Sequence, residues 1–220
     1  MVCTDWRCWC LGLLLALGAG CAQTPKSKKK PPQADQSSAA VVQDGAPITL
    51  IPNPYLAQEI KVPPAAQTSF RNALVAMQSE DWRTAETQLR ALAEAHPQLS
   101  GPQVNLGLVY WRQNKLEEAE TAFKQALAIN PLNNDAYVQY GYFLREQGRF
   151  NEAEAVYLKA LEVWPHNLAA HRNLGILYDL YMGKFDAAMK HYEMVLRLSP
   201  EPNKEVEGWI IDLKRRLAAG

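Results

Sequence analysis

Four prolines recur at a nearly constant interval along this 220-residue chain, and this repeat constrains the fold more than any other feature. Pro97, Pro131, Pro165 and Pro200 are 34, 34 and 35 residues apart. Other residues keep the same step, namely Ala85, Ala119, Ala153 and Ala188, and Gly107, Gly141 and Gly175. Since proline makes up about 5% and glycine about 7% of an average sequence, such a register arises by chance about once in a million. The interval therefore predicts stacked supersecondary units, which usually present an extended surface rather than a catalytic pocket.

Three segments at equivalent places in the repeat share a pattern of small and large residues. They are NLGLVY at 105–110, QYGYFL at 139–144 and NLGILY at 173–178. This pattern, with the periodic alanines and prolines, resembles the tetratricopeptide repeat, a 34-residue helix–turn–helix unit. The resemblance implies an all-α fold, an α-solenoid of about four repeats followed by a capping helix. The repeats are expected at 67–99, 100–133, 134–167 and 168–202, and the cap at 203–220.

Each periodic position has a packing reason. The glycines and alanines are expected where two helices cross closely, and large residues such as Tyr157 fill the remaining space. In the last unit the turn contains Met182-Gly183, and we expect this turn to be one residue longer, which would explain the 35-residue step. In the final helix, apolar residues share one stripe at helical spacing. It is interpreted as the cap of the solenoid, and the alternative is a helix on which a partner docks.

The first 20 residues have the layout of a secretory signal. An apolar run from Cys8 to Leu17 follows a short start that holds Arg7, and small residues precede Cys21. The run is too short to span a bilayer, which needs about 20 residues. The alternative is an N-terminal anchor that stays on the protein.

Cysteine usage indicates the purpose of this signal. The four cysteines all lie at or before residue 21, so the mature chain would keep only Cys21, as its first residue. The segment Leu17-Gly18-Ala19-Gly20-Cys21 resembles the lipobox of bacterial lipoproteins, in which the cysteine carries several acyl chains such as palmitate. Because Ala22 rather than aspartate follows, the resemblance implies the inner leaflet of the outer membrane, on the periplasmic side.

Residues 21–66 are rich in lysine and proline and show no helical period, so they are predicted to be a flexible tether. Within them the more apolar stretch 48–60 either lies against the folded body or belongs to the tether. Acids and bases are equal in number, at 23 each, which argues against a nucleic-acid partner.

Catalytic chemistry is not indicated. The histidines (His96, His166, His171 and His191) form no pair at the i, i+4 spacing of metal ligands. The sequence contains no phosphate-binding loop and no nucleophile elbow. The acids of residues 117–120 are interpreted as a solvated helix face. We therefore expect no enzymatic activity, no cofactor, no metal and no small-molecule substrate.

A binding function remains. In tetratricopeptide arrays the first helices line a concave groove, which implies four rows of residues here. The first row is Phe70, Val104, Val138 and Arg172, and the fourth is Met77, Trp111, Arg145 and Asp179. The candidate groove residues for a protein or peptide partner are Arg71, Asn105, Leu108, Trp111, Gln139, Tyr142, Asn173 and Ile176.

The amides Asn105, Gln139 and Asn173 resemble the asparagine ladder that holds an extended peptide backbone, since an amide both donates and accepts. Alternatively, Asn105 and Asn173 satisfy neighbouring helix ends. Trp111 and Tyr142 are expected either to anchor a partner or to pack between helices.

The sequence as a whole predicts a membrane-anchored periplasmic adaptor or assembly factor for an envelope complex. One version resembles the lipoprotein pilotins that assist pilus secretins, and the other resembles scaffolds for peptidoglycan enzymes or energy-transducing complexes. The alternative function is a structural tether between the outer membrane and the cell wall, without a protein client.

Overall fold

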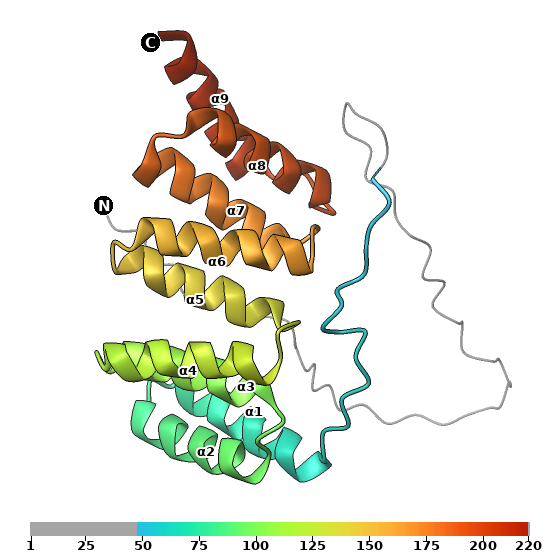
Figure 1. Ribbon diagram of the computed structural model, residues 1–220, viewed down its shortest axis with the longest axis vertical. Coiled ribbons are helices and arrows are strands. Elements are labelled where there is room, and N and C mark those ends of the chain that lie inside the picture. The colour runs from blue at the N-terminus through green and yellow to red at the C-terminus, as the bar shows by residue number, and fades with distance from the viewer. Residues whose placement is uncertain (1–47, 220) are drawn as a thin grey trace, which may run out of the picture. The chain divides into compact units, whose positions relative to one another are not determined.

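The computed structural model describes residues 48–219 (Figure 1). The predicted signal peptide, the lipidation residue Cys21 and the tether up to residue 47 lie outside the described residues. The described part folds into helix–turn–helix pairs and contains no strand, which confirms the all-α prediction. The first two pairs are α1 (Pro64–Gln78) with α2 (Trp82–Ala95) and α3 (Ser100–Arg112) with α4 (Leu116–Ile129). The next two are α5 (Asn134–Glu146) with α6 (Phe150–Val163), and α7 (Leu168–Ile176) with α8 (Phe185–Leu198).

The pairs stack in chain order, because each second helix also packs on the first helix of the next pair. A final helix, α9 (Lys204–Ala219), packs on α8 and completes the predicted α-solenoid with its cap (Figure 1). None of the helices in the described range combines the length and the apolar character needed to cross a bilayer.

The periodic glycines lie where the two helices of a pair cross. A Cβ atom at Gly107, Gly141 or Gly175 would lie within 2.6 Å of an aromatic ring on the second helix. At Gly141 this ring belongs to Tyr157, whose side chain is fully buried. Glycine is therefore required at these positions by the close approach of a ring that has no free space to move into.

Each pair turns through one residue in the left-handed region. These residues are Glu80, Asn114, Gly148 and Gly183, with φ between 59° and 73°. Glycine adopts this conformation without steric cost, and asparagine does so more readily than most residues. The glutamate at the first of these turns was not expected from the sequence.

The extra residue of the fourth repeat lies within its first helix, so the prediction of a longer turn was wrong. Asn133 and Gly148 are 15 residues apart, whereas the equivalent Asn167 and Gly183 are 16 apart. Between them, the helix widens into the π-helical segment η2 (Leu177–Met182), which accommodates one more residue.

Buried polar groups connect successive repeats at the start of the first helices. Asn133 caps α5 by accepting from the amide of Ala136 at 3.1 Å, and it donates to Ser100 Oγ at 2.8 Å. Asn167 caps α7 in the same way and donates to Asn134 Oδ1 at 2.8 Å. These contacts satisfy buried donors at helix termini and fix the distance between neighbouring repeats.

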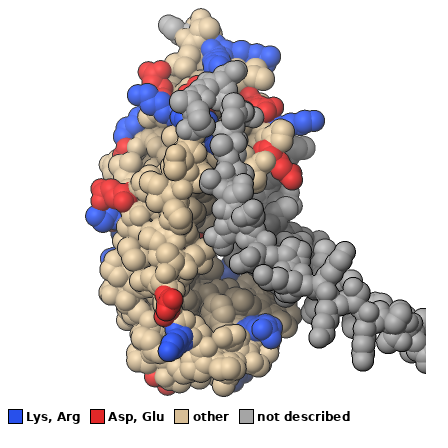
Figure 2. Space-filling model, turned by 90° about the vertical axis from the view of Figure 1, so that its right-hand side faces the viewer, with Lys and Arg blue, Asp and Glu red and all other residues tan. Residues whose placement is uncertain are grey.

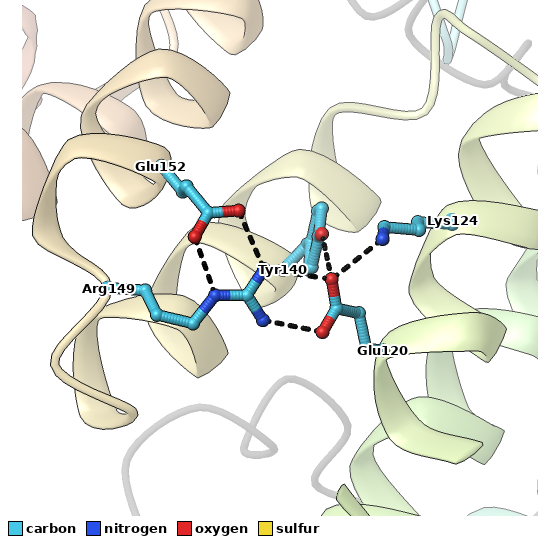
Figure 3. A network of polar contacts seen from close by, with 5 residues as sticks. All are labelled: Glu120, Lys124, Tyr140, Arg149 and Glu152. Carbon is cyan, nitrogen blue, oxygen red and sulfur yellow. Dashed lines mark hydrogen bonds and ion pairs between the residues drawn. The ribbon is translucent and has the colours of Figure 1, made fainter. Parts of the chain in front are cut away.

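Three ion pairs join neighbouring repeats at the same step. Glu86 contacts Lys115 at 2.9 Å, Glu120 contacts Arg149 Nη2 at 3.0 Å, and Glu154 contacts Lys184 at 2.8 Å. Glu120 also accepts from Lys124 and Tyr140, and Arg149 binds Glu152 as well (Figure 3). The hydrogen bond from Arg149 is the main cause that lowers the pKa of Glu120 to about 2. The prediction of a solvated face therefore holds for the exposed Glu117 and Glu118 but is wrong for Glu120.

The cap occupies the side of the fourth repeat that a fifth repeat would cover. Arg172 of α7 pairs with Glu205 at 3.0 Å and lies over the ring of Trp209. Asp179 of η2 is buried, where it accepts from Arg216 at 2.6 Å and from the Tyr192 hydroxyl at 3.2 Å. Asp179 therefore faces the cap, and its predicted place in the groove is wrong.

Candidate peptide-binding face

The candidate groove residues lie on the first helices of the four repeats, which form one face of the array. Arg71 on α1 is exposed, and the other seven are half-buried, so each presents part of its surface. Val104 and Val138 of the predicted first row are instead buried in the helix packing. The candidates are Arg71 on α1, Asn105, Leu108 and Trp111 on α3, Gln139 and Tyr142 on α5, and Asn173 and Ile176 on α7.

Four residues of this face form a continuous run across three repeats, here named the aromatic strip: Trp111, Tyr142, Arg145 and Tyr181. The rings of Trp111 and Tyr142 meet edge to face with centroids 5.3 Å apart. The guanidinium of Arg145 lies 4.8 Å from the centre of the Tyr142 ring and 5.7 Å from that of Tyr181. Such contacts between cations and rings hold the aromatic side chains in place.

Arg145 links the strip to the amide row. Its Nη1 donates to Asn173 Oδ1 at 3.3 Å, and it pairs with Glu146 at 3.1 Å. Its side chain is only 9% exposed, because the rings of Tyr142 and Tyr181 and the amide of Asn173 surround it. The structure thus brings Trp111, Tyr142 and Asn173 together through Arg145. This residue was predicted in the fourth row but was not among the candidate groove residues.

The amide groups of the row are partly engaged within their own helices. Asn105 Nδ2 donates to the carbonyl of Gly101 at 2.9 Å, and Asn173 Nδ2 donates to that of Ala169 at 2.9 Å. This back-bonding to the residue four positions earlier is common for short polar side chains in helices. A peptide backbone would have to exchange with these bonds or use the remaining acceptor of Asn105, and the amide ladder stays a prediction.

Tyr181 was missed because the insertion in η2 changes the register of its helix. Its ring lies 4.9 Å from that of Phe150, and 44% of Tyr181 is exposed. Its neighbour Leu180 is 66% exposed. The only signal in the sequence was the single 35-residue step, which does not reveal where the extra residue lies.

Two histidines that are 20 positions apart meet between α7 and α8. The Nδ1 atoms of His171 and His191 are 2.8 Å apart, and His171 Nε2 contacts the carbonyl of Pro165 at 2.9 Å. Burial lowers the pKa of both side chains, that of His191 to about 4. In the described range no three His, Cys, Asp or Glu side chains come together as metal ligands would.

A cavity of about 580 Å³ is lined by residues of α2, α3 and α4. Its lining mixes opposite charges, with Arg90 beside Glu94 and Glu118. None of the candidate groove residues lines it. The aromatic strip is therefore separate from this cavity.

Models of the tetratricopeptide repeat match residues 70–134 and 133–201, which together span more than half of the chain. The chain belongs to the tetratricopeptide repeat family. A tetratricopeptide array is a protein-interaction scaffold rather than a catalytic fold, which identifies the described region as a protein–protein interaction adaptor.

Solved structures of other tetratricopeptide proteins are similar. PilF of Pseudomonas aeruginosa is 26% identical with a TM-score of 0.63, over 70% of each chain. MamA is 21% identical with a TM-score of 0.53, over 60% of this chain and 77% of MamA. MamA of Desulfovibrio magneticus RS-1 is 16% identical with a TM-score of 0.58, over 72% of this chain and 88% of its own. The MamA likenesses show the fold alone. No curated protein sequence matches significantly.

Proposed function

We propose that this tetratricopeptide protein is a lipid-anchored periplasmic adaptor that holds an extended segment of a client protein along its first helices. The aromatic strip carries the proposal. It crosses three repeats, Arg145 lies against two of its three rings, and it borders the half-buried amide of Asn173. Aromatic side chains held in this manner lose little conformational entropy on binding, which favours their use as anchors.

The test is site-specific photocrosslinking in the periplasm. A photoreactive residue at Tyr142 should capture a client, and the same residue at Leu158, exposed on α6, should not. Leu158 is the matched control because it lies on the second helix of the same repeat. Capture from Leu158 alone would place the client on the opposite face.

The proposed anchor is Cys21, which supports an outer-membrane location because of the lipobox and Ala22. Cys21→Ser should abolish fatty-acid labelling and release the protein from the membrane fraction. Membrane retention of this variant with residues 1–20 still attached would favour the anchor that stays on the protein.

The client belongs to an envelope complex, and pilus-secretin assembly, peptidoglycan enzymes and energy-transducing complexes are the classes to be compared. The likeness to PilF reaches 26% identity over 70% of each chain, so the complexes in which PilF acts should be tested first. If the purified protein bound sacculi and no client crosslinked to Tyr142, the structural tether to the cell wall would be the better account.

A further inference from the structure

The stretch before the first repeat lies against the turns between repeats, although it forms no helix (Figure 1). The backbone amide of Ile51 donates to His166 Nδ1 at 2.7 Å. The carbonyl of the same residue accepts from Trp164 Nε1 at 2.8 Å. Two side chains of the turn between α6 and α7 therefore hold both backbone groups of one non-helical residue.

A second contact lies one repeat earlier in the array. Asn130 Nδ2 donates to Gln58 Oε1 at 2.7 Å. Asn130 follows α4 at the same position at which Trp164 follows α6, one 34-residue step apart. Residues 48–60 thus run along the array in the direction opposite to its repeats, from the third–fourth turn back toward α1.

Between these two contacts the segment stabilises its own conformation. Asn53 accepts from the amide of Tyr55 through its side chain at 2.9 Å and from the amide of Ala57 through its carbonyl at 3.1 Å. This arrangement is typical of an asparagine that starts a turn. The turn shortens the path between the two sites, so that Ile51 and Gln58 meet neighbouring repeats.

The contacts are made mainly to the backbone of the segment. Ile51 is 50% exposed and Leu56 is 77% exposed, so these apolar side chains do not provide the attachment. The described atoms visible on this side of the molecule carry charges only singly or in small groups (Figure 2). A histidine acceptor and an indole donor are complementary to any extended peptide unit, whatever its side chain.

We propose that Asn130, Trp164 and His166 form a binding site for non-helical polypeptide, and that residues 48–60 of the same chain are its ligand. This site shares no residue with the aromatic strip. Held there, the chain enters the array beside the fourth repeat and reaches α1 only after passing two turns. The tether function rests on the proposed anchor. Because residues 48–60 are held against the array, they do not lengthen the distance that the tether can span between the anchor and the array.

Hydrogen–deuterium exchange of the full-length protein tests the site. In the wild type, peptides that cover residues 48–60 should exchange more slowly than the rate for an unstructured chain. His166→Ala removes the acceptor of the Ile51 amide, and Trp164→Phe removes one donor while keeping an aromatic ring. Each change should accelerate exchange of this segment about fivefold, as expected for one net hydrogen bond.

His96→Ala is the matched control, because His96 follows α2 at the position of Asn130 and Trp164 and makes no hydrogen bond to residues 48–62 in the described part. It should leave exchange of the segment unchanged. Exchange of residues 48–60 at the unstructured rate in the wild type would overturn the proposal. Protection that persists in both variants would overturn the assignment to Trp164 and His166. Crosslinking from Tyr142 is a separate measurement, so a negative result in the exchange experiment would leave the client proposal intact.

Discussion

Adding a single methyl group at Gly141 should destabilise the array. The new Cβ would lie 2.5 Å from Cε1 and 2.8 Å from Cδ1 of Tyr157. Carbon atoms pack best about 3.5–4.0 Å apart, so the ring or the helix would have to move by about 1 Å. Because Tyr157 is fully buried, the neighbours of its ring would have to move as well.

The size of the effect follows from two opposing terms. Inserting a methyl group into a well-packed core costs about 1–3 kcal/mol, and a contact this short favours the upper end of that range. Replacing glycine by alanine inside a helix contributes up to about 1 kcal/mol in the other direction. We therefore expect Gly141→Ala to lower the free energy of unfolding by about 2 kcal/mol, or Tm by about 4–8 °C for a domain of this size.

The same substitution at Gly208 provides the control. Gly208 lies inside α9, and its Cβ would meet no atom within 4 Å. Gly208→Ala should therefore raise stability by up to about 1 kcal/mol through helix propensity alone. Urea unfolding followed by circular dichroism measures both variants. If Gly141→Ala matched or exceeded the wild type, the close helix crossing would not be the reason for this glycine.

Three further results are expected. The pKa of Glu120 is about 2 in the folded state and about 4.3 when unfolded. The ionised carboxylate therefore contributes to the free energy of unfolding, by about 1 kcal/mol for a partly exposed pair. This contribution should be present above pH ~4.5 and lost as pH falls toward 2. Urea midpoints at pH 5 and 3 should show this loss in the wild type and a smaller one in Glu120→Gln. The pKa of His191 is about 4 when folded and about 6.5 when unfolded, so the unfolded state binds more protons between these values and stability should fall as pH drops from 6.5 to 4. His191→Phe should flatten this slope, and an unchanged slope would contradict the burial of the histidine pair. Trp111→Ala should weaken client binding at least tenfold, as for an anchor residue, while Glu118→Ala on α4 should not, provided that both variants keep their Tm.

The fold class was predictable because the residues that create the helix crossings are themselves periodic. Gly141 and Tyr157 have equivalents in the neighbouring repeats, and each such pair of a glycine and an aromatic ring makes the same contact between two helices. The ion pairs were equally visible in principle, since Glu86, Glu120 and Glu154 each follow a periodic alanine. They were missed because charged residues on a helix are usually solvated, and the sequence does not show which of them faces a neighbouring repeat.

The site was only partly predictable because its contacts depend on the distance between neighbouring first helices. Trp111 and Tyr142 were correctly placed on that face, but their edge-to-face contact is set by the stacking of two repeats. The same stacking surrounds Arg145 with two rings and an amide. Assigning residues to rows predicts the direction in which each side chain points, whereas the burial of that side chain depends on its neighbours in adjacent rows.

The π-helical insertion gives the last repeat two roles that one regular helix cannot combine. Counted from the start of α7, Asp179 takes the place of Trp111 and Arg145, yet it is buried against Arg216 of the cap. Counted back from the left-handed residue, Leu180 is three positions before Gly183, as Trp111 is before Asn114 and Arg145 is before Gly148. Because of the extra residue, both Asp179 and Leu180 correspond to the single position that Trp111 and Arg145 occupy in their repeats. Asp179 fixes the cap, while Leu180 and Tyr181 remain exposed where the aromatic strip ends. Deleting Leu180 should therefore weaken the contact with the cap or shorten the strip, because a regular helix has only one residue for both positions.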